Sequence, residues 1–71
     1  MSPEKLAYMA NQIGKFFAHR PPDVAVAAIA DHITRFWDPR MRREILANRA
    51  TVNLDPSVRQ AVDQLHESGQ K

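Results

Sequence analysis

Apolar residues recur at helical spacing near the start of the chain. Between residues 4 and 17 they fill one arc when successive residues are placed about 100° apart, and polar residues fill the opposite arc. The apolar set is Leu6, Met9, Ala10, Ile13, Phe16 and Phe17. Gly14 interrupts this predicted first helix. It is either a tolerated interior glycine, costing about 1 kcal/mol relative to alanine, or the point where another helix approaches closely.

The clearest periodicity lies in residues 24–37, which predict a second helix. Asp31, His32 and Arg35 lie on its polar side, where His32 is expected to meet solvent or a partner. One arc of roughly 120° holds the apolar residues Val26, Ile29, Ala30, Ile33, Phe36 and Trp37. The pattern therefore assigns Phe36 and Trp37 to the core. The predicted structural anchors are Phe17, Ile33, Phe36, Trp37, Asp38 and Pro39.

A capping residue followed by proline marks three predicted helix starts, at residues 2–3, 38–39 and 55–56. The side-chain oxygen can accept a free N–H of the first turn, and proline fits the first helical position because no N–H is needed there. Asp38 and Pro39 should thus form a corner between the second and third helices. Pro21 and Pro22 should end the first helix, and Asp23 should cap the second.

The third predicted helix, residues 39–48, has a mixed face. Arg42 and Arg49 fall within the arc of its apolar residues Met41, Ile45 and Leu46. Their aliphatic stems could cover the edge of the core while the guanidinium groups reach water. Alternatively the face docks on another macromolecule, because arginine is enriched at interfaces and pairs with carboxylates or phosphates. We favour docking.

The rest of the chain predicts a loop over residues 48–53 and a short fourth helix. Its core positions would be Val58, Ala61, Val62 and Leu65, and the polar residues 66–71 should form a frayed tail. No convincing strand pattern occurs. The prediction is an all-α single domain over residues 1–71, a small bundle of three main helices plus a short C-terminal fourth helix.

The positive charge is confined to one segment. Residues 35–49 hold five arginines and two acidic residues, whereas the remaining residues balance to −1, which gives the net charge of +2. A chain of 71 residues buries only roughly 60% of its unfolded surface, so a stabilising supplement is expected. With no cysteine and no zinc-like histidine spacing, a partner is the expected supplement. The predicted partner-binding residues are Asn11, Gln12, Arg35, Arg40, Arg42, Arg43 and Arg49.

Catalysis and metal binding are not expected of this sequence. Ser2, Ser57 and Ser68 lie at caps or in the tail, and the carboxylates next to helix starts are explained by capping. No apolar run approaches the roughly 20 residues of a membrane span, and the first residues lack signal-peptide features. We therefore expect no catalytic residue, no metal, no membrane and a cytoplasmic location.

Nucleic-acid binding by a small basic helical protein is the main alternative. The pI is near 9.5 and arginines cluster on one helix after a tight corner. Few side chains besides Asn48 could read base edges, and a net charge of +2 is low for electrostatically driven DNA binding. The composition therefore favours a protein partner.

Two motifs are familiar. Residues 9–17, MANQIGKFF, and residues 32–42, HITRFWDPRMR, resemble the delta subunit of the NAD-dependent, molybdenum-containing formate dehydrogenases of bacteria. The resemblance covers roughly residues 6–65, and the second motif is the more specific because no general physical reason makes it recur.

The resemblance implies a small accessory subunit of a cytoplasmic complex that oxidises formate to CO2 and passes electrons to NAD. It places molybdenum-guanine dinucleotide, iron–sulfur clusters, FMN and NAD on other subunits, and no cofactor on this chain. The implied partner is the large catalytic molybdenum subunit, which the delta subunit would help to assemble, stabilise or load with cofactor. A free chaperone that handles the molybdenum cofactor itself is a further alternative. The resemblance supplies no catalytic residue.

Overall fold

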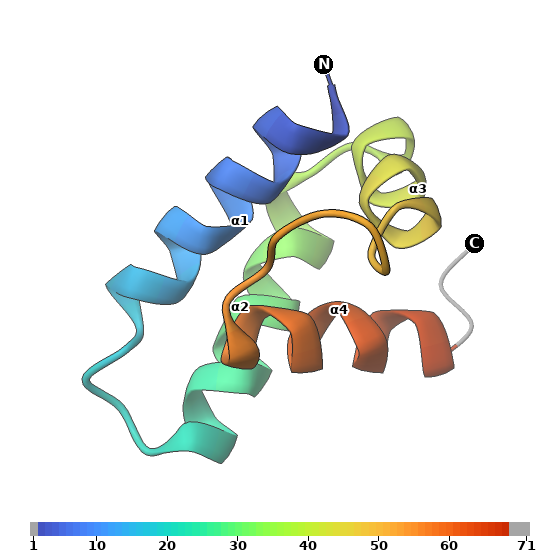
Figure 1. Cartoon of the computed structure of the whole chain (residues 1–71). Coiled ribbons are helices and arrows are strands. Elements are labelled where there is room, and N and C mark those ends of the chain that lie inside the picture. Colours follow the sequence, from blue (N-terminus) through green and yellow to red (C-terminus); the bar gives the residue numbers. More distant parts are fainter. Residues whose placement is uncertain (1, 69–71) are drawn as a thin grey trace.

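Four helices and their connections make up the part of the chain that the computed structural model describes, residues 2–68. They are α1 (Pro3–Phe16), α2 (Pro22–Phe36), α3 (Pro39–Ala47) and α4 (Pro56–Glu67). α4 crosses α2 and makes the most extensive contact with it, while α1 and α3 complete the bundle (Figure 1). No strand occurs within these residues. The all-α prediction is confirmed, with α3 as the shortest helix.

Side-chain caps form at two of the four helix starts. The Ser2 hydroxyl accepts the Lys5 N–H at 3.1 Å, and the Asp38 carboxylate accepts the Met41 N–H at 2.8 Å. Asp55 occupies the N-cap position of α4 without a side-chain cap bond. The prediction that Asp23 caps α2 is wrong, because the helix already begins at Pro22 and places Asp23 in its first turn.

The predicted tail also needs a correction. α4 continues through Glu67, so His66 and Glu67 are helical and not frayed. The Ser68 N–H donates to the Gln64 carbonyl at 2.9 Å and closes this end of the helix. Residues 69–71 of the predicted tail lie outside the described residues.

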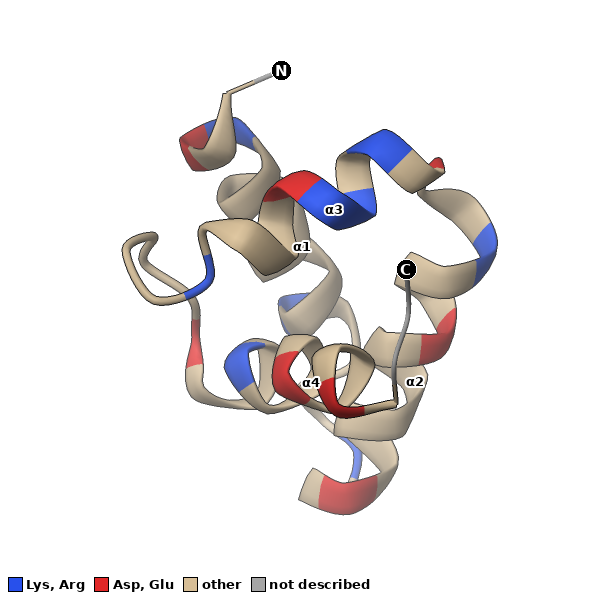
Figure 2. Ribbon diagram, turned by 90° about the vertical axis from the view of Figure 1, so that its right-hand side faces the viewer, with Lys and Arg blue, Asp and Glu red and all other residues tan. Residues whose placement is uncertain are grey.

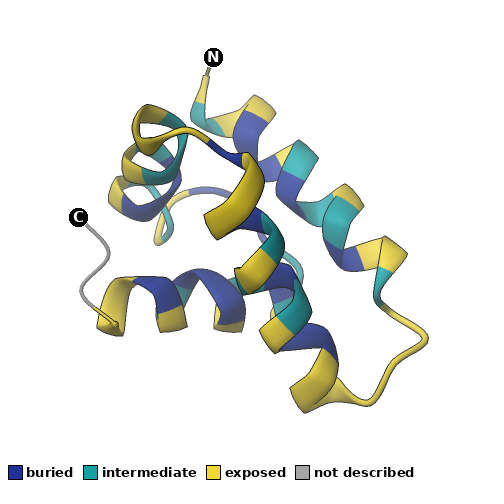
Figure 3. Cartoon of the chain, turned by 180° about the vertical axis from the view of Figure 1, so that it is seen from behind, coloured by how far each residue is buried: buried dark blue, intermediate teal, exposed yellow. Residues whose placement is uncertain are grey.

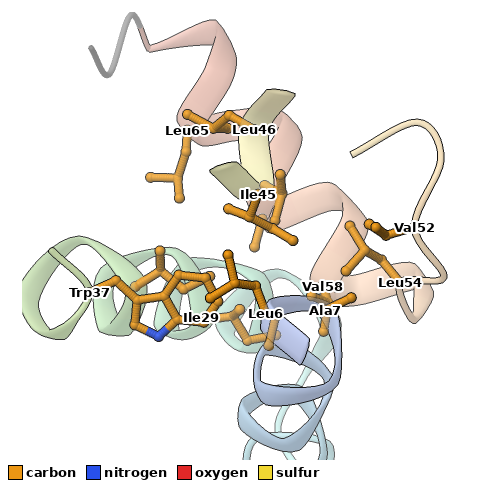
Figure 4. Close-up of a cluster of buried hydrophobic side chains, with 14 of the residues drawn as sticks. Leu6, Ala7, Ile29, Trp37, Ile45, Leu46, Val52, Leu54, Val58 and Leu65 are labelled. Carbon is orange, nitrogen blue, oxygen red and sulfur yellow. The ribbon is translucent and has the colours of Figure 1, made fainter. Parts of the chain in front are cut away.

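All four helices and the loop before α4 contribute to one buried cluster. Figure 4 shows side chains from these segments converging on it, and Figure 3 shows the buried bands on the inner sides of the helices. The predicted burial of Ile33 and Trp37 is confirmed, with exposed fractions of 0% and 5%. The cluster consists of Leu6, Ala7, Ala10, Val26, Ile29, Ile33, Trp37, Ile45, Leu46, Val52, Leu54, Val58, Ala61, Val62 and Leu65.

Phe36 is not part of this cluster, and its predicted core position is wrong. Its side chain is 71% exposed and packs at a tilted angle against His32, one helical turn earlier, with ring centroids 4.7 Å apart. On the helical wheel Phe36 lies at the end of the apolar arc, next to the polar residue His32. Because Phe36 is also the last residue of α2, its side chain lies on the polar side of the helix. Phe16 is likewise 71% exposed, and Phe17 is only partly buried against the core.

Gly14 marks a close approach between α1 and α4. A Cβ atom added there would lie 2.5 Å from Cγ2 of Val58, a distance that real Cβ atoms essentially never show. Of the two explanations that the sequence leaves open, close helix approach is therefore the correct one.

Candidate docking surfaces

The corner between α2 and α3 sets the direction of the arginine-rich segment. Trp37 leaves the helix with extended backbone angles, φ −89° and ψ 138°, yet its N–H still donates to the Ile33 carbonyl at 3.0 Å. Asp38 then caps α3, and Pro39 takes its first position. This sharp change of direction buries the Trp37 side chain while the arginines that follow project from a new helix.

Arg42 is held by its own chain. Its guanidinium group donates to the carbonyl of Thr34 at 3.3 Å and to the carbonyl of Trp37. Carbonyls at a helix C-terminus lack helical partners, and a cation is favourable at that end of the dipole. Arg42 therefore caps the end of α2 and ties it to α3.

Two further arginines brace the loop between α3 and α4. Arg49 donates to the Leu46 carbonyl at 2.6 Å, and its Nε lies 3.5 Å from a carboxylate oxygen of Asp63. Arg59 donates to the carbonyls of Arg49 at 2.7 Å and Val52 at 3.1 Å. Sequence reasoning missed Arg59. Its position directly after Val58, a predicted core residue of the fourth helix, could have indicated that its side chain lies at the edge of the core.

These contacts explain why Arg42 and Arg49 lie within the apolar arc of the third helix. Both side chains are partly buried and bond to backbone oxygens of this chain. These bonds to the chain's own carbonyls account for the position of the two arginines, a role that neither explanation from the sequence included. Their role as contacts to a partner stays a prediction.

Asn11 fixes α1 to the same loop from the opposite side. Its side-chain amide donates to the Asn53 carbonyl at 2.9 Å, and its side-chain oxygen accepts the Asp55 N–H at 2.9 Å. Asp55 also lies near Lys15, with oxygen and nitrogen 3.6 Å apart. Gln12, the other predicted polar contact on α1, is exposed.

Asn11→Ala should lower the free energy of unfolding by about 1–2 kcal/mol, because two hydrogen bonds of ordinary strength are lost. Urea denaturation followed by circular dichroism measures the change. The matched control is Gln12→Ala, a neighbouring exposed amide, which should change stability by less than about 0.5 kcal/mol. Equal effects of the two substitutions would contradict the role of Asn11 as a clamp.

Arg40 and Arg43 form a surface that we call the arginine face. They lie three residues apart on α3, so they are neighbours on the helix, and both are exposed. Figure 2 marks the basic residues of α3 in blue along its ribbon. Within residues 2–68, neither side chain has a hydrogen bond or ion pair to another group. The exposed Arg35 on α2 instead pairs with Asp31, at 3.0 Å.

A separate apolar groove runs between α1 and α2. It has a volume of about 320 Å3 and is lined by Gln12, Ile13, Phe16, Phe17 and His32. Phe36 adjoins it through its ring contact with His32. We call these six residues the aromatic groove.

Two kinds of site do not occur in the described part of the chain. Residues 2–68 contain no group of three or more His, Asp or Glu side chains placed to hold a metal ion. Within the same range, no helix combines the length and apolar composition that a membrane crossing requires.

Comparison with known protein families gives a match over most of the chain. The family model described as "NADH-dependant formate dehydrogenase delta subunit FdsD" matches residues 5–62, from the first turn of α1 into α4. No significant match was found among curated proteins or solved structures. The matched range contains both motifs, residues 9–17 and 32–42, and confirms the resemblance seen in them. The chain therefore belongs to the family of NADH-dependent formate dehydrogenase delta subunits.

Proposed function

We propose that this chain is a non-catalytic accessory subunit of a cytoplasmic NAD-dependent formate dehydrogenase. It binds the large molybdenum subunit and supports the assembly, cofactor insertion or stability of that subunit. Molybdenum-guanine dinucleotide, iron–sulfur clusters, FMN and NAD are then carried by other subunits. The family match over residues 5–62 supports the complex, and the exposed arginine face supports the mode of binding.

The position of Arg40 and Arg43 favours an intermolecular role. Arg40 lies in the first turn of α3, near the positive end of the helix dipole, where a cation is unfavourable, and Arg43 follows in the second turn. Unlike Arg42, neither side chain has a hydrogen bond or ion pair within residues 2–68. Guanidinium groups match carboxylates in a bidentate geometry, so an acidic patch on the large subunit would complement the face.

The variant Arg40→Gln/Arg43→Gln should keep its stability within about 0.5 kcal/mol, because both side chains are exposed. Its affinity for the large subunit should fall at least roughly tenfold, equivalent to about 1.4 kcal/mol. Co-expression followed by affinity purification, and biolayer interferometry on the purified partners, measure the loss.

The matched control is Lys5→Gln/Lys15→Gln, which removes two exposed positive charges from α1. It changes the net charge by the same amount and should leave the affinity nearly unchanged. If both double variants bind the large subunit as tightly as the unmodified chain, the arginine face is not the docking surface. If they weaken binding equally, the effect is one of net charge alone.

A further inference from the structure

Two large aromatic side chains of the aromatic groove are exposed and do not belong to the buried core. Phe16 and Phe36 are each 71% exposed, although the four helices already enclose a buried cluster. Exposed aromatic side chains that gather around a hollow mark interaction sites more often than scattered ones do. Tyr8 is also exposed, at 65%, but lies outside this groove.

Neighbouring side chains hold the rings of the groove in place. Phe16 packs edge-on against Phe17 with centroids 5.0 Å apart, and the Arg20 guanidinium lies 5.5 Å from the Phe17 ring centroid. On α2, the rings of His32 and Phe36 pack against each other at a tilted angle. Aromatic and arginine side chains are enriched at interfaces, and side chains that already pack on one another lose less conformational entropy on binding.

The shape of the groove suits a helix. Its α1 wall presents Gln12 and Phe16, and its α2 wall presents His32 and Phe36, each pair four residues apart. Such rows are the ridges between which a third helix can place its own side chains. A volume of about 320 Å3 lies at the lower end for ligand sites and suits apolar side chains better than a large cofactor.

One cation borders the groove. The guanidinium group of Arg20 lies 5.5 Å from the ring centroid of the lining residue Phe17, whereas Lys15 is paired with Asp55. On α2, Asp31 is already paired with Arg35. Asp23 lies nine residues before His32, which at about 100° per residue places it on the opposite side of α2. The groove therefore complements an acidic partner.

We propose that the aromatic groove binds an acidic amphipathic helix of a partner protein. An apolar side chain of that helix lies between Phe16 and His32, and its carboxylates face Arg20. This inference goes beyond the proposed function, because it concerns a different surface and does not depend on the arginine face or on the identity of the large subunit.

The test uses the full chain and two synthetic helical peptides. Both carry leucine at positions i, i+3, i+4 and i+7, and the other positions are mostly glutamate in one peptide and mostly lysine in the other. In 15N-HSQC titrations the glutamate peptide should bind at least roughly tenfold more tightly, and its affinity should fall with added salt. The shift changes should centre on Gln12, Ile13, Phe17 and His32.

Substitutions in the groove should remove this binding. Phe16→Ser and Phe36→Ser should each weaken it at least roughly fivefold, and both variants should fold because the side chains are exposed. Tyr8→Ser is the matched control, since it removes an exposed aromatic side chain outside the groove, and it should bind normally.

Four results would overturn the proposal. They are no binding of the glutamate peptide, equal binding of the two peptides, an equal loss in Tyr8→Ser, and self-association of the chain that Phe16→Ser abolishes. The last result, measured by sedimentation equilibrium, would assign the groove to a second copy of the chain. Because the large subunit is absent from these experiments, their failure is distinguishable from a failure of the proposed function.

Discussion

Replacing Trp37 with alanine should lower the free energy of unfolding by about 3–5 kcal/mol. The indole is 5% exposed and lies in the buried cluster with Leu6 and Ile29 (Figure 4). A domain of 71 residues has a total stability of roughly 4–11 kcal/mol, so this loss removes a large part of it. Thermal and urea denaturation followed by circular dichroism should show a strongly lowered midpoint or no cooperative transition.

The adjacent residue provides the control for this experiment. Phe36 is also a large aromatic side chain, yet it is 71% exposed, so Phe36→Ala should cost less than about 1 kcal/mol. Trp37→Phe should fall between the two alanine variants, because it keeps part of the buried volume. An unchanged melt of Trp37→Ala, or equal losses in both alanine variants, would contradict the burial of Trp37 as a source of stability.

The contrast between Phe36 and Trp37 also shows what periodicity could predict. The arcs of α1 and α2 identified the buried residues Leu6, Ile29 and Ile33 correctly, because a regular helix projects every side chain at a fixed angle. At the end of α2 this geometry stops. Phe36, the last helical residue, lies at the edge of the apolar arc beside His32, and the extended backbone of Trp37 that follows is a feature that periodicity does not describe.

Local sequence signals predicted some of the helix N-caps correctly and one of them wrongly. Ser2 and Asp38 cap their helices as expected, because such a cap depends on only a few neighbouring residues. Asp23 does not, because two prolines in succession allow the helix to begin one residue before it. Because the helix could begin at either Pro22 or the residue after Asp23, the sequence alone does not determine the N-terminal boundary of α2.

The candidate surfaces depended more on tertiary contacts. The bonds of Asn11 join residues 42 and 44 positions away, and those of Arg59 reach across a loop that has no periodic pattern. The sequence could show that arginines concentrate between residues 35 and 49, but not that Arg42 and Arg49 bond to this chain. Only the structure separates these two from the exposed Arg40 and Arg43.

The contact at Gly14 should produce a strong energetic coupling with Val58. Gly14→Ala should destabilise the chain by about 1–2 kcal/mol, because overpacking against a buried valine outweighs the better helix propensity of alanine. Val58 is β-branched and fully buried, so its side chain cannot rotate away cheaply. Val58→Ala alone should cost about 2 kcal/mol through lost burial.

In the double variant the alanine methyl at position 14 occupies space that Val58 has vacated. The double variant should therefore be at least about 1 kcal/mol more stable than the sum of the single losses predicts. A second cycle, pairing Gly14→Ala with Val62→Ala, is the matched control. Val62 is equally buried on α4 but is not among the atoms that a Cβ at position 14 would meet, so that cycle should be additive within about 0.5 kcal/mol. Additivity in both cycles, or stabilisation by Gly14→Ala alone, would show that α1 and α4 do not approach closely at this glycine.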